Sequence, residues 1–191
     1  MNSTEFKSNE ERYFAWYLEE LVDTGYIQKF SYEPESIQLS PTLFQFKETP
    51  LKTKIKTTRH KLLSEHIYTP DFKIWWEEKA EGIFHSDSYT GTPFAAIQSI
   101  SYIETKGTFD PYNMTRLFRI NQKWCYDKYK IFINLIIPTK LFKETFTPKR
   151  FLFTDIQKRV RNIPHKIIML DEYINKRQEY RTTLNSLRSN T

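Results

Sequence analysis

The alternation of hydrophobic and polar residues first predicts a helix over residues 8–24. Its apolar positions recur three or four residues apart, as in one face of an α-helix: Phe14, Leu18, Leu21 and Val22. Ser8 is suited to cap this helix, and Glu11 stands three residues later, at the capping-box position. Gly25 follows where a C-terminal cap is expected.

The strands are predicted from β-rich runs bounded by Pro and Gly. Residues 26–40 read as one or two strands interrupted by Pro34, and the basic stretch 52–61 as a strand with a basic face or a mobile loop. Pro70 fits a strand start or edge because it has no N–H to donate. Three further strands are expected at residues 66–76, 99–107 and 131–137, the last buried on both faces.

The remaining segments complete an α/β pattern. Residues 77–98 are polar with turn signals, so we expect a loop or hairpin insertion there. A second helix is predicted at 113–130, with two faces. The apolar face holds Met114, Leu117, Phe118, Trp124 and Cys125, and the basic face holds Arg116, Arg119 and Lys123. Trp75, Trp76 and Trp124 are expected in the core.

Composition fits a globular chain with a skewed charge. Residues 1–110 hold 12 Lys and Arg against 17 Asp and Glu, whereas residues 111–191 hold 17 against 6. Such a skew favours a polyanionic partner, although basic helices also serve solubility. The single cysteine, Cys125, excludes a disulfide framework, and no apolar run approaches the ~20 residues of a membrane span. We therefore expect no membrane association and a cytoplasmic location.

Acids and a lysine occupy two of the predicted strands. Residues two apart on a strand share a face, so Glu104 and Lys106 project together. If the strand that begins at Asp71 lies beside theirs, Asp71 meets Glu104. Two carboxylates are the hard oxygen ligands that suit Mg²⁺, and a nearby ammonium can position an attacking water. A plain alternative is an exposed Glu104–Lys106 ion pair.

The residues Pro70-Asp71 and Glu104-Thr105-Lys106 resemble the motif of the PD-(D/E)xK nuclease superfamily. The resemblance implies a restriction-endonuclease-like mixed β-sheet core flanked by helices, over residues 1–140. A basic helical extension of one or two helices follows over residues 141–191. The resemblance also implies a glutamate in the first helix that helps to hold the metal. Glu11 is preferred to Glu10 for this role. The alternative is that Glu11 serves only as a capping residue.

The family resemblance assigns the remaining roles. Asp71, Glu104, the backbone carbonyl of Thr105 and Glu11 would hold Mg²⁺, with Mn²⁺ as a substitute, and Lys106 would orient water. Gln122 and Tyr126 resemble the Q-x-x-x-Y of one branch of the superfamily. The expected nucleic-acid contacts are Arg116, Arg119, Gln122, Lys123, Lys149, Arg150 and Arg159.

The implied function is a Mg²⁺-dependent endonuclease that cuts DNA with structural or weak sequence selectivity. A junction resolvase of this family would act as a homodimer, and the composition is compatible with a phage or bacterial source, which would place the protein in the cytoplasm of a bacterial or phage-infected cell. The main alternative is a nuclease-fold protein that binds DNA without cutting it. A second is a basic structural protein in which the motif is coincidental.

Overall fold

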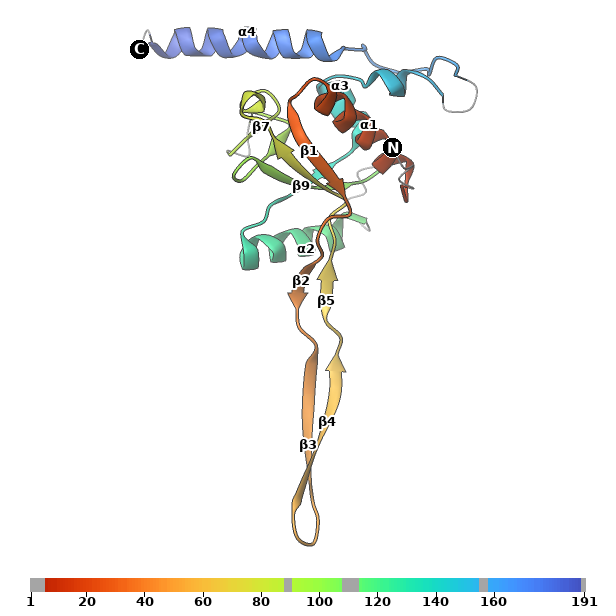
Figure 1. Ribbon diagram of the computed structural model, residues 1–191, viewed down its shortest axis with the longest axis vertical. Helices are drawn as coiled ribbons and strands as arrows, with labels where there is room; N and C mark the ends of the chain where they lie inside the picture. The colour runs from red at the N-terminus through yellow and green to blue at the C-terminus, as the bar shows by residue number, and fades with distance from the viewer. Residues whose placement is uncertain (1–5, 88–90, 108–113, 155–157, 190–191) are drawn as a thin grey trace.

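The computed structural model describes residues 6–87, 91–107, 114–154 and 158–189 as a mixed α/β body with a long projecting arm (Figure 1). The core sheet has the order β1-β6-β9-β10. Strands β1 (Ile27–Tyr32), β6 (Phe72–Trp76) and β9 (Ile100–Thr105) are antiparallel neighbours, and β10 (Ile133–Ile136) runs parallel to β9. The predicted mixed sheet is therefore confirmed.

Helix α1 (Asn9–Asp23) covers one face of this sheet through its apolar side. The Ser8 hydroxyl accepts a hydrogen bond from the Glu11 N–H, as an N-cap should. At the other end Gly25 has φ +69°, and the Tyr26 N–H bonds to the carbonyl of Leu21, which is the Schellman geometry that favours glycine. The predicted helix and both of its caps are confirmed.

The main core lies between α1, the sheet and the C-terminal segments. Its side chains are largely aromatic and almost fully buried, and they include Phe14, Tyr17, Phe72, Trp76, Phe94 and Phe146. Tyr17 stacks on Phe146 with ring centroids 4.2 Å apart. Helix α3 (Pro138–Glu144) begins directly after β10, because Pro138 cannot extend a strand ladder but fits the first turn of a helix.

Helix α2 (Met114–Tyr129) covers the opposite face and forms a smaller core with β10 and the base of the arm. Phe118 and Cys125 are buried there as predicted, but Leu117 and Trp124 are 60% and 38% exposed. The buried face of α2 is therefore narrower than predicted and does not include Leu117 or Trp124. Asn121 is buried instead, because its amide oxygen bonds to Nε2 of His66.

The arm is the largest departure from the predicted fold. Strands β2 (Ile37–Ser40) and β5 (His66–Tyr68) pair at its base, and β3 (Leu43–Pro50) and β4 (Ile55–Leu63) form its shaft, which projects far from the body (Figure 1). Of the basic stretch 52–61, residues 55–61 form a strand as the first alternative predicted, and residues 52–54 lie in the turn between β3 and β4. The single strand predicted at 66–76 is wrong, since Thr69–Asp71 separate β5 from β6 and the two strands belong to different sheets.

The segments after β6 and β10 pack around the upper end of the body. The predicted insertion at 77–98 contains the 3₁₀ turn η1 (Glu78–Ala80) and the short strands β7 (His85–Ser86) and β8 (Phe94–Ala95). After α3 come the 3₁₀ turn η2 (Lys149–Leu152) and helix α4 (Leu170–Ser189), which lies across the top in Figure 1. Helix α4 is fastened by buried Tyr173 and by Arg177, which donates to the Gly82 carbonyl. None of the helices in the described part of the chain has the length and apolarity needed to cross a membrane.

Candidate active site

Asp71 lies at the point where the arm returns to the core sheet. Phe72 pairs with Ile103, and continuing this antiparallel register places Asp71 across from Glu104. Asp71 Oδ2 accepts hydrogen bonds from the Thr105 N–H at 2.6 Å and from Thr105 Oγ1 at 2.7 Å. Pro70 is buried beside it and fixes an extended entry into β6. The predicted proximity of Asp71 and the Glu104 strand is therefore confirmed.

Glu104 is a buried carboxylate, 8% exposed, held by two donors. The ammonium of Lys106 lies 2.6 Å from Glu104 Oε1, and the hydroxyl of Tyr68 donates to Glu104 Oε2 at 2.7 Å. The Lys106 side chain is 22% exposed, so this ion pair is reachable from solvent at one end only. Tyr68 was not anticipated; its position two residues before Pro70, on a strand next to the motif, was the available signal.

Glu11 approaches the site from α1 and is also 8% exposed. Its Oε2 accepts hydrogen bonds from the Lys7 N–H at 2.8 Å and from the Tyr32 hydroxyl at 2.6 Å. The capping role is therefore only partly realised, since the carboxylate binds the N–H of Lys7. Glu10 lies against the end of the motif strand: its Oε1 would lie 2.9 Å from a Cβ added to Gly107, the residue after Lys106.

The charges of Glu104 and Glu11 affect the pKa of Asp71. Burial raises the pKa of Asp71, and the negative charges of Glu104 and, more weakly, Glu11 raise it too, whereas the hydrogen bonds from Thr105 lower it; the net pKa is about 6. Burial and the nearby Glu104 charge also raise the pKa of Tyr68, so its hydroxyl remains a donor. Carboxylates that repel one another in a partly buried place are a common setting for a bound cation.

A metal at this site would depend on two side chains rather than three. Among the described residues no group of three or more His, Cys, Asp and Glu is arranged to hold a metal ion. Asp71 and Glu104, with the backbone carbonyl of Thr105, still provide hard oxygen donors. Mg²⁺ commonly uses one or two carboxylates and takes its other ligands from water and substrate phosphates. The donor set therefore fits Mg²⁺, and Glu11 is near enough for its charge to raise the pKa of Asp71.

The predicted phosphate contacts on α2 are surface residues that do not bond to the acids within the described part of the chain. Arg116, Arg119 and Lys123 are exposed, and in the described part of the chain no hydrogen bond or ion pair joins them to Asp71, Glu104 or Lys106. Gln122 is engaged elsewhere, because its amide donates to the Ile133 carbonyl. It ties α2 to the start of β10.

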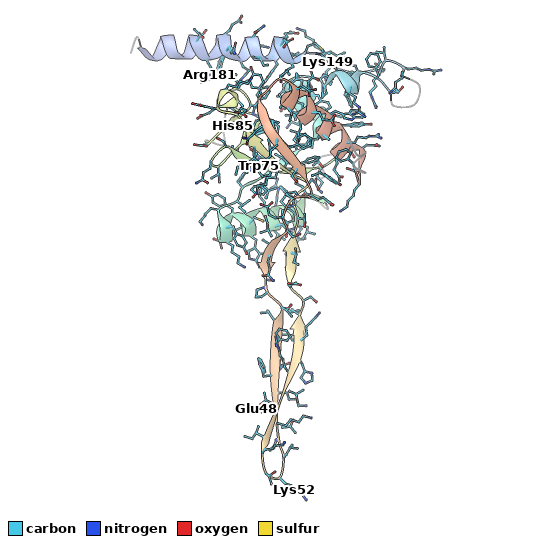
Figure 2. All side chains as sticks on the ribbon, viewed as in Figure 1. Glu48, Lys52, Trp75, His85, Lys149 and Arg181 are labelled. Atoms are coloured by element: carbon cyan, nitrogen blue, oxygen red, sulfur yellow. The ribbon has the colours of Figure 1, made fainter. Side chains whose placement is uncertain are left out.

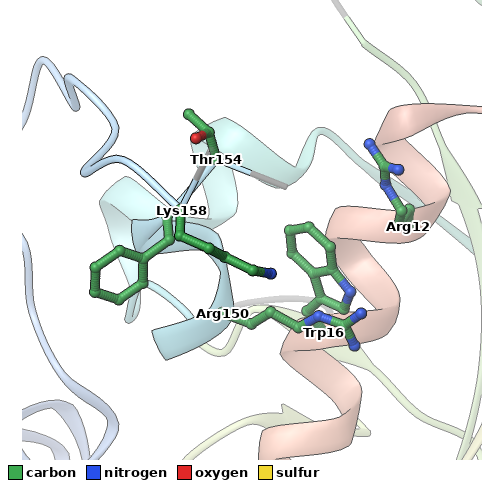
Figure 3. A pocket seen from close by; sticks show the side chains of 6 residues that line it. Arg12, Trp16, Arg150, Thr154 and Lys158 are labelled. Carbon is green, nitrogen blue, oxygen red and sulfur yellow. The ribbon is translucent and has the colours of Figure 1, made fainter. Parts of the chain in front are cut away.

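The C-terminal cations gather on the outer side of α1. Figure 3 shows Trp16 between Arg12 and Arg150, whose guanidinium groups lie 5.6 and 4.8 Å from the indole ring. Together with Phe153, Thr154 and Lys158 they line a pocket of about 360 Å³. Arg150 also lies 3.4 Å from Glu19, and the Lys149 N–H donates to Glu20. Arg159 lines a neighbouring pocket with Lys140 and Lys143, and neither pocket is lined by Asp71, Glu104 or Lys106.

Comparison with known proteins does not assign the chain to a family. No family model matches it, and no curated protein or solved structure gives a significant match. The functional argument therefore depends on the site itself.

Proposed function

We propose that this protein is a metal-dependent endonuclease that hydrolyses phosphodiester bonds in DNA. The observation that carries the proposal is the meeting of Asp71, Glu104 and Lys106 at the ends of two antiparallel core strands. The element order, with a glutamate-bearing helix before the sheet and a basic helix after the lysine, agrees with the nuclease resemblance. The basic charge of residues 111–191 supports a polyanionic substrate.

Each residue has a role that follows from its surroundings. Asp71 and Glu104 would hold Mg²⁺, helped by the Thr105 carbonyl, while Tyr68 and Thr105 fix the two carboxylates. A bound Mg²⁺ supplies Lewis-acid polarisation of a phosphoryl oxygen and a bound water of lowered pKa. Lys106 is the one cation in contact with Glu104 among the described residues, and its partly exposed ammonium would orient the attacking water or neutralise charge on the phosphate. Arg116 and Arg119 would guide the DNA backbone from α2.

One observation favours the non-enzymatic alternative. Both oxygens of Glu104 already have donors, Lys106 and Tyr68, so the cluster is satisfied as an ion pair without a metal. In that case the fold would serve DNA binding alone. The two functions differ in whether Asp71 and Lys106 are needed for strand cleavage.

Cleavage of supercoiled plasmid and of branched DNA, with Mg²⁺ or Mn²⁺ and then with chelator, separates them. We expect metal-dependent nicking that is lost in Asp71→Asn and in Lys106→Met. Asp127→Asn and Lys79→Met are matched controls on exposed positions and should cut like the wild type. DNA binding without cleavage under every metal condition would support the alternative, and cleavage that survives Asp71→Asn would refute the assigned site.

A further inference from the structure

The β3–β4 arm is a two-stranded ribbon that is exposed along its length. In the described part of the chain β3 and β4 pair only with each other, and their side chains point into solvent as far as the tip near Lys52 (Figure 2). Nine residues in β4 span roughly 30 Å at the usual rise of a strand. An isolated two-stranded hairpin is only marginally stable in water. We therefore expect a ribbon of this length to bind a partner molecule.

The arm is strongly basic. Residues 43–63 contain six Lys and Arg and only one acid, Glu48. No ion pair involves these six cations within the described residues. Unpaired cations concentrated on a projecting element attract a polyanion.

The two faces of the ribbon carry different chemistry. Alternation along the paired strands places Phe44, Phe46, Ile55, Arg59 and Lys61 on one face, and Gln45, Lys47, Thr49, Lys56, Thr58 and His60 on the other. The Arg59 guanidinium lies 3.3 Å from the centre of the Phe44 ring, and Phe46 is 64% exposed. Cations, hydroxyls, an amide and exposed apolar groups together are the side chains that contact phosphates, base edges and thymine methyl groups.

We propose that the β3–β4 arm inserts into the major groove of duplex DNA and holds the duplex for the candidate active site. A two-stranded β-ribbon fits the major groove, which is about 12 Å wide, and a ribbon of roughly 30 Å is close to one helical turn. The inference deepens the proposed nuclease function and rests on it for the role of the held DNA.

The base of the arm is continuous with the candidate site. Strand β5 closes the arm, and its Tyr68 bonds to Glu104; the chain reaches Asp71 three residues later. Helix α2 secures the other base strand, because the Tyr129 hydroxyl donates to the Gln38 carbonyl at 2.6 Å. A duplex held along the arm would therefore be attached close to the acids and to the basic face of α2.

A second copy of the chain is a less suitable occupant. Pairing two arms would bring two strongly basic ribbons together, and like charges across a sheet are destabilising. An RNA duplex is also disfavoured, since its deep, narrow major groove cannot be read by side chains.

The test measures DNA binding without catalysis. Fluorescence anisotropy with a labelled duplex of about 30 base pairs, in chelator and across about 50–200 mM salt, reports affinity and its salt dependence. The arm variant is Lys47→Glu with Lys56→Glu, two exposed residues on the polar face. The matched control is Lys29→Glu with Lys79→Glu, two exposed residues of β1 and η1 outside both the arm and the basic region 111–191, which changes the net charge equally.

We expect the arm variant to bind the duplex about tenfold or more weakly and to lose about one unit of salt slope per phosphate contact removed. The control should change affinity much less. A second variant, in which residues 43–63 are replaced by a short turn, should bind as weakly as the arm variant while its circular dichroism shows a folded body.

Three results would overturn the arm proposal. The first is that the arm variants bind the duplex as tightly as the wild type does. The second is that an RNA duplex competes with the labelled DNA as well as unlabelled DNA does. The third is that the wild type sediments as a dimer and the arm variants as monomers, with DNA affinity unchanged. Cleavage is read separately: if the wild type binds through the arm but never cuts, the nuclease proposal falls and the arm proposal stands. If it cuts and the arm variants bind normally, only the arm proposal falls.

Discussion

The Tyr68 hydroxyl donates a 2.7 Å hydrogen bond to Glu104 Oε2, and this bond joins the base of the arm to the candidate active site. Tyr68 is 8% exposed, as is Glu104, so the bond lies in a poorly hydrated place. The ammonium of Lys106 holds the other carboxylate oxygen. The orientation of Glu104 is thus set by one residue from the arm and one from its own strand.

Replacing Tyr68 by Phe should lower the free energy of unfolding by about 1–3 kcal/mol, because a buried carboxylate oxygen loses its donor. Urea denaturation followed by circular dichroism measures the change. Tyr126→Phe is the control, since that hydroxyl is on an exposed residue of α2 and its loss should cost little. Equal stability of the two variants would mean that the Tyr68–Glu104 bond does not hold the site together.

The raised pKa of Asp71 predicts a pH-dependent stability. Its pKa is 3.8 in an ordinary setting and about 6 in the folded protein, so the folded state binds a proton more tightly between these values. The charged carboxylate therefore costs stability that is absent below about pH 4, grows up to about pH 6 and is constant above it. A shift from 3.8 to about 6 corresponds to on the order of 3 kcal/mol.

Asp71→Asn should remove this cost while its amide oxygen still accepts from Thr105. The stability of Asp71→Asn relative to wild type should rise from pH 4 to pH 6 and then level off, as measured by urea unfolding at each pH. Asp127→Asn, at an exposed position of α2, is the matched control. A relative stability that falls over this interval would contradict the burial and charge repulsion at Asp71.

Periodicity and local chemistry predicted the body of the fold well. The helix at residues 8–24 has a regular apolar spacing and both caps, so local signals and tertiary packing agree, and α1 was found within one residue at each end. The run at 131–137, apolar except for Asn134, also became the buried strand β10, and Asn134 is itself buried. The sequence predicted that Asp71 would meet Glu104 if their strands were neighbours. The structure shows that β6 and β9 are neighbours.

The arm could not be predicted in the same way. Its residues do not alternate between a buried and an exposed side. Every residue of β3 is exposed, and in β4 only Thr58 is half-buried. Hydrophobic periodicity reports burial, and an element without a buried face gives no such signal. The prediction that Trp124 lies in the core was also wrong. Its hydrophobic character suggested burial, but its indole stacks on His66 at the surface, with ring centroids 5.4 Å apart.

The two glutamates of α1 should differ in their effect on metal binding. Glu11 is buried, and its charge raises the pKa of Asp71, whereas Glu10 lies against Gly107. Glu11→Gln keeps an oxygen that can accept from Lys7 and Tyr32 but removes the charge. We therefore expect it to weaken metal binding several-fold, and Glu10→Gln to have a smaller effect.

The thermal shift on adding Mn²⁺ measures this without any DNA. An ion that binds only the folded state stabilises it by about 1.4 kcal/mol when present at about ten times its Kd. The shift should be largest in wild type, smaller in Glu11→Gln and absent in Asp71→Asn. If Glu10→Gln reduces the shift more than Glu11→Gln does, the helical acid has been assigned to the wrong residue.

Two phenylalanines offer a contrast between the body and the arm. Phe72 is fully buried beneath α1, where its ring lies 5.2 Å from that of Phe14, and Phe46 is 64% exposed on the arm. Phe72→Ala should lower the free energy of unfolding by about 3–5 kcal/mol, because it leaves a cavity in the core. Phe46→Ala should change it by less than about 0.5 kcal/mol, as is usual for a surface position. If Phe46→Ala were as destabilising as Phe72→Ala, the arm would have to be packed against the body or another chain in solution, and the projecting ribbon that the DNA-binding argument requires would not exist.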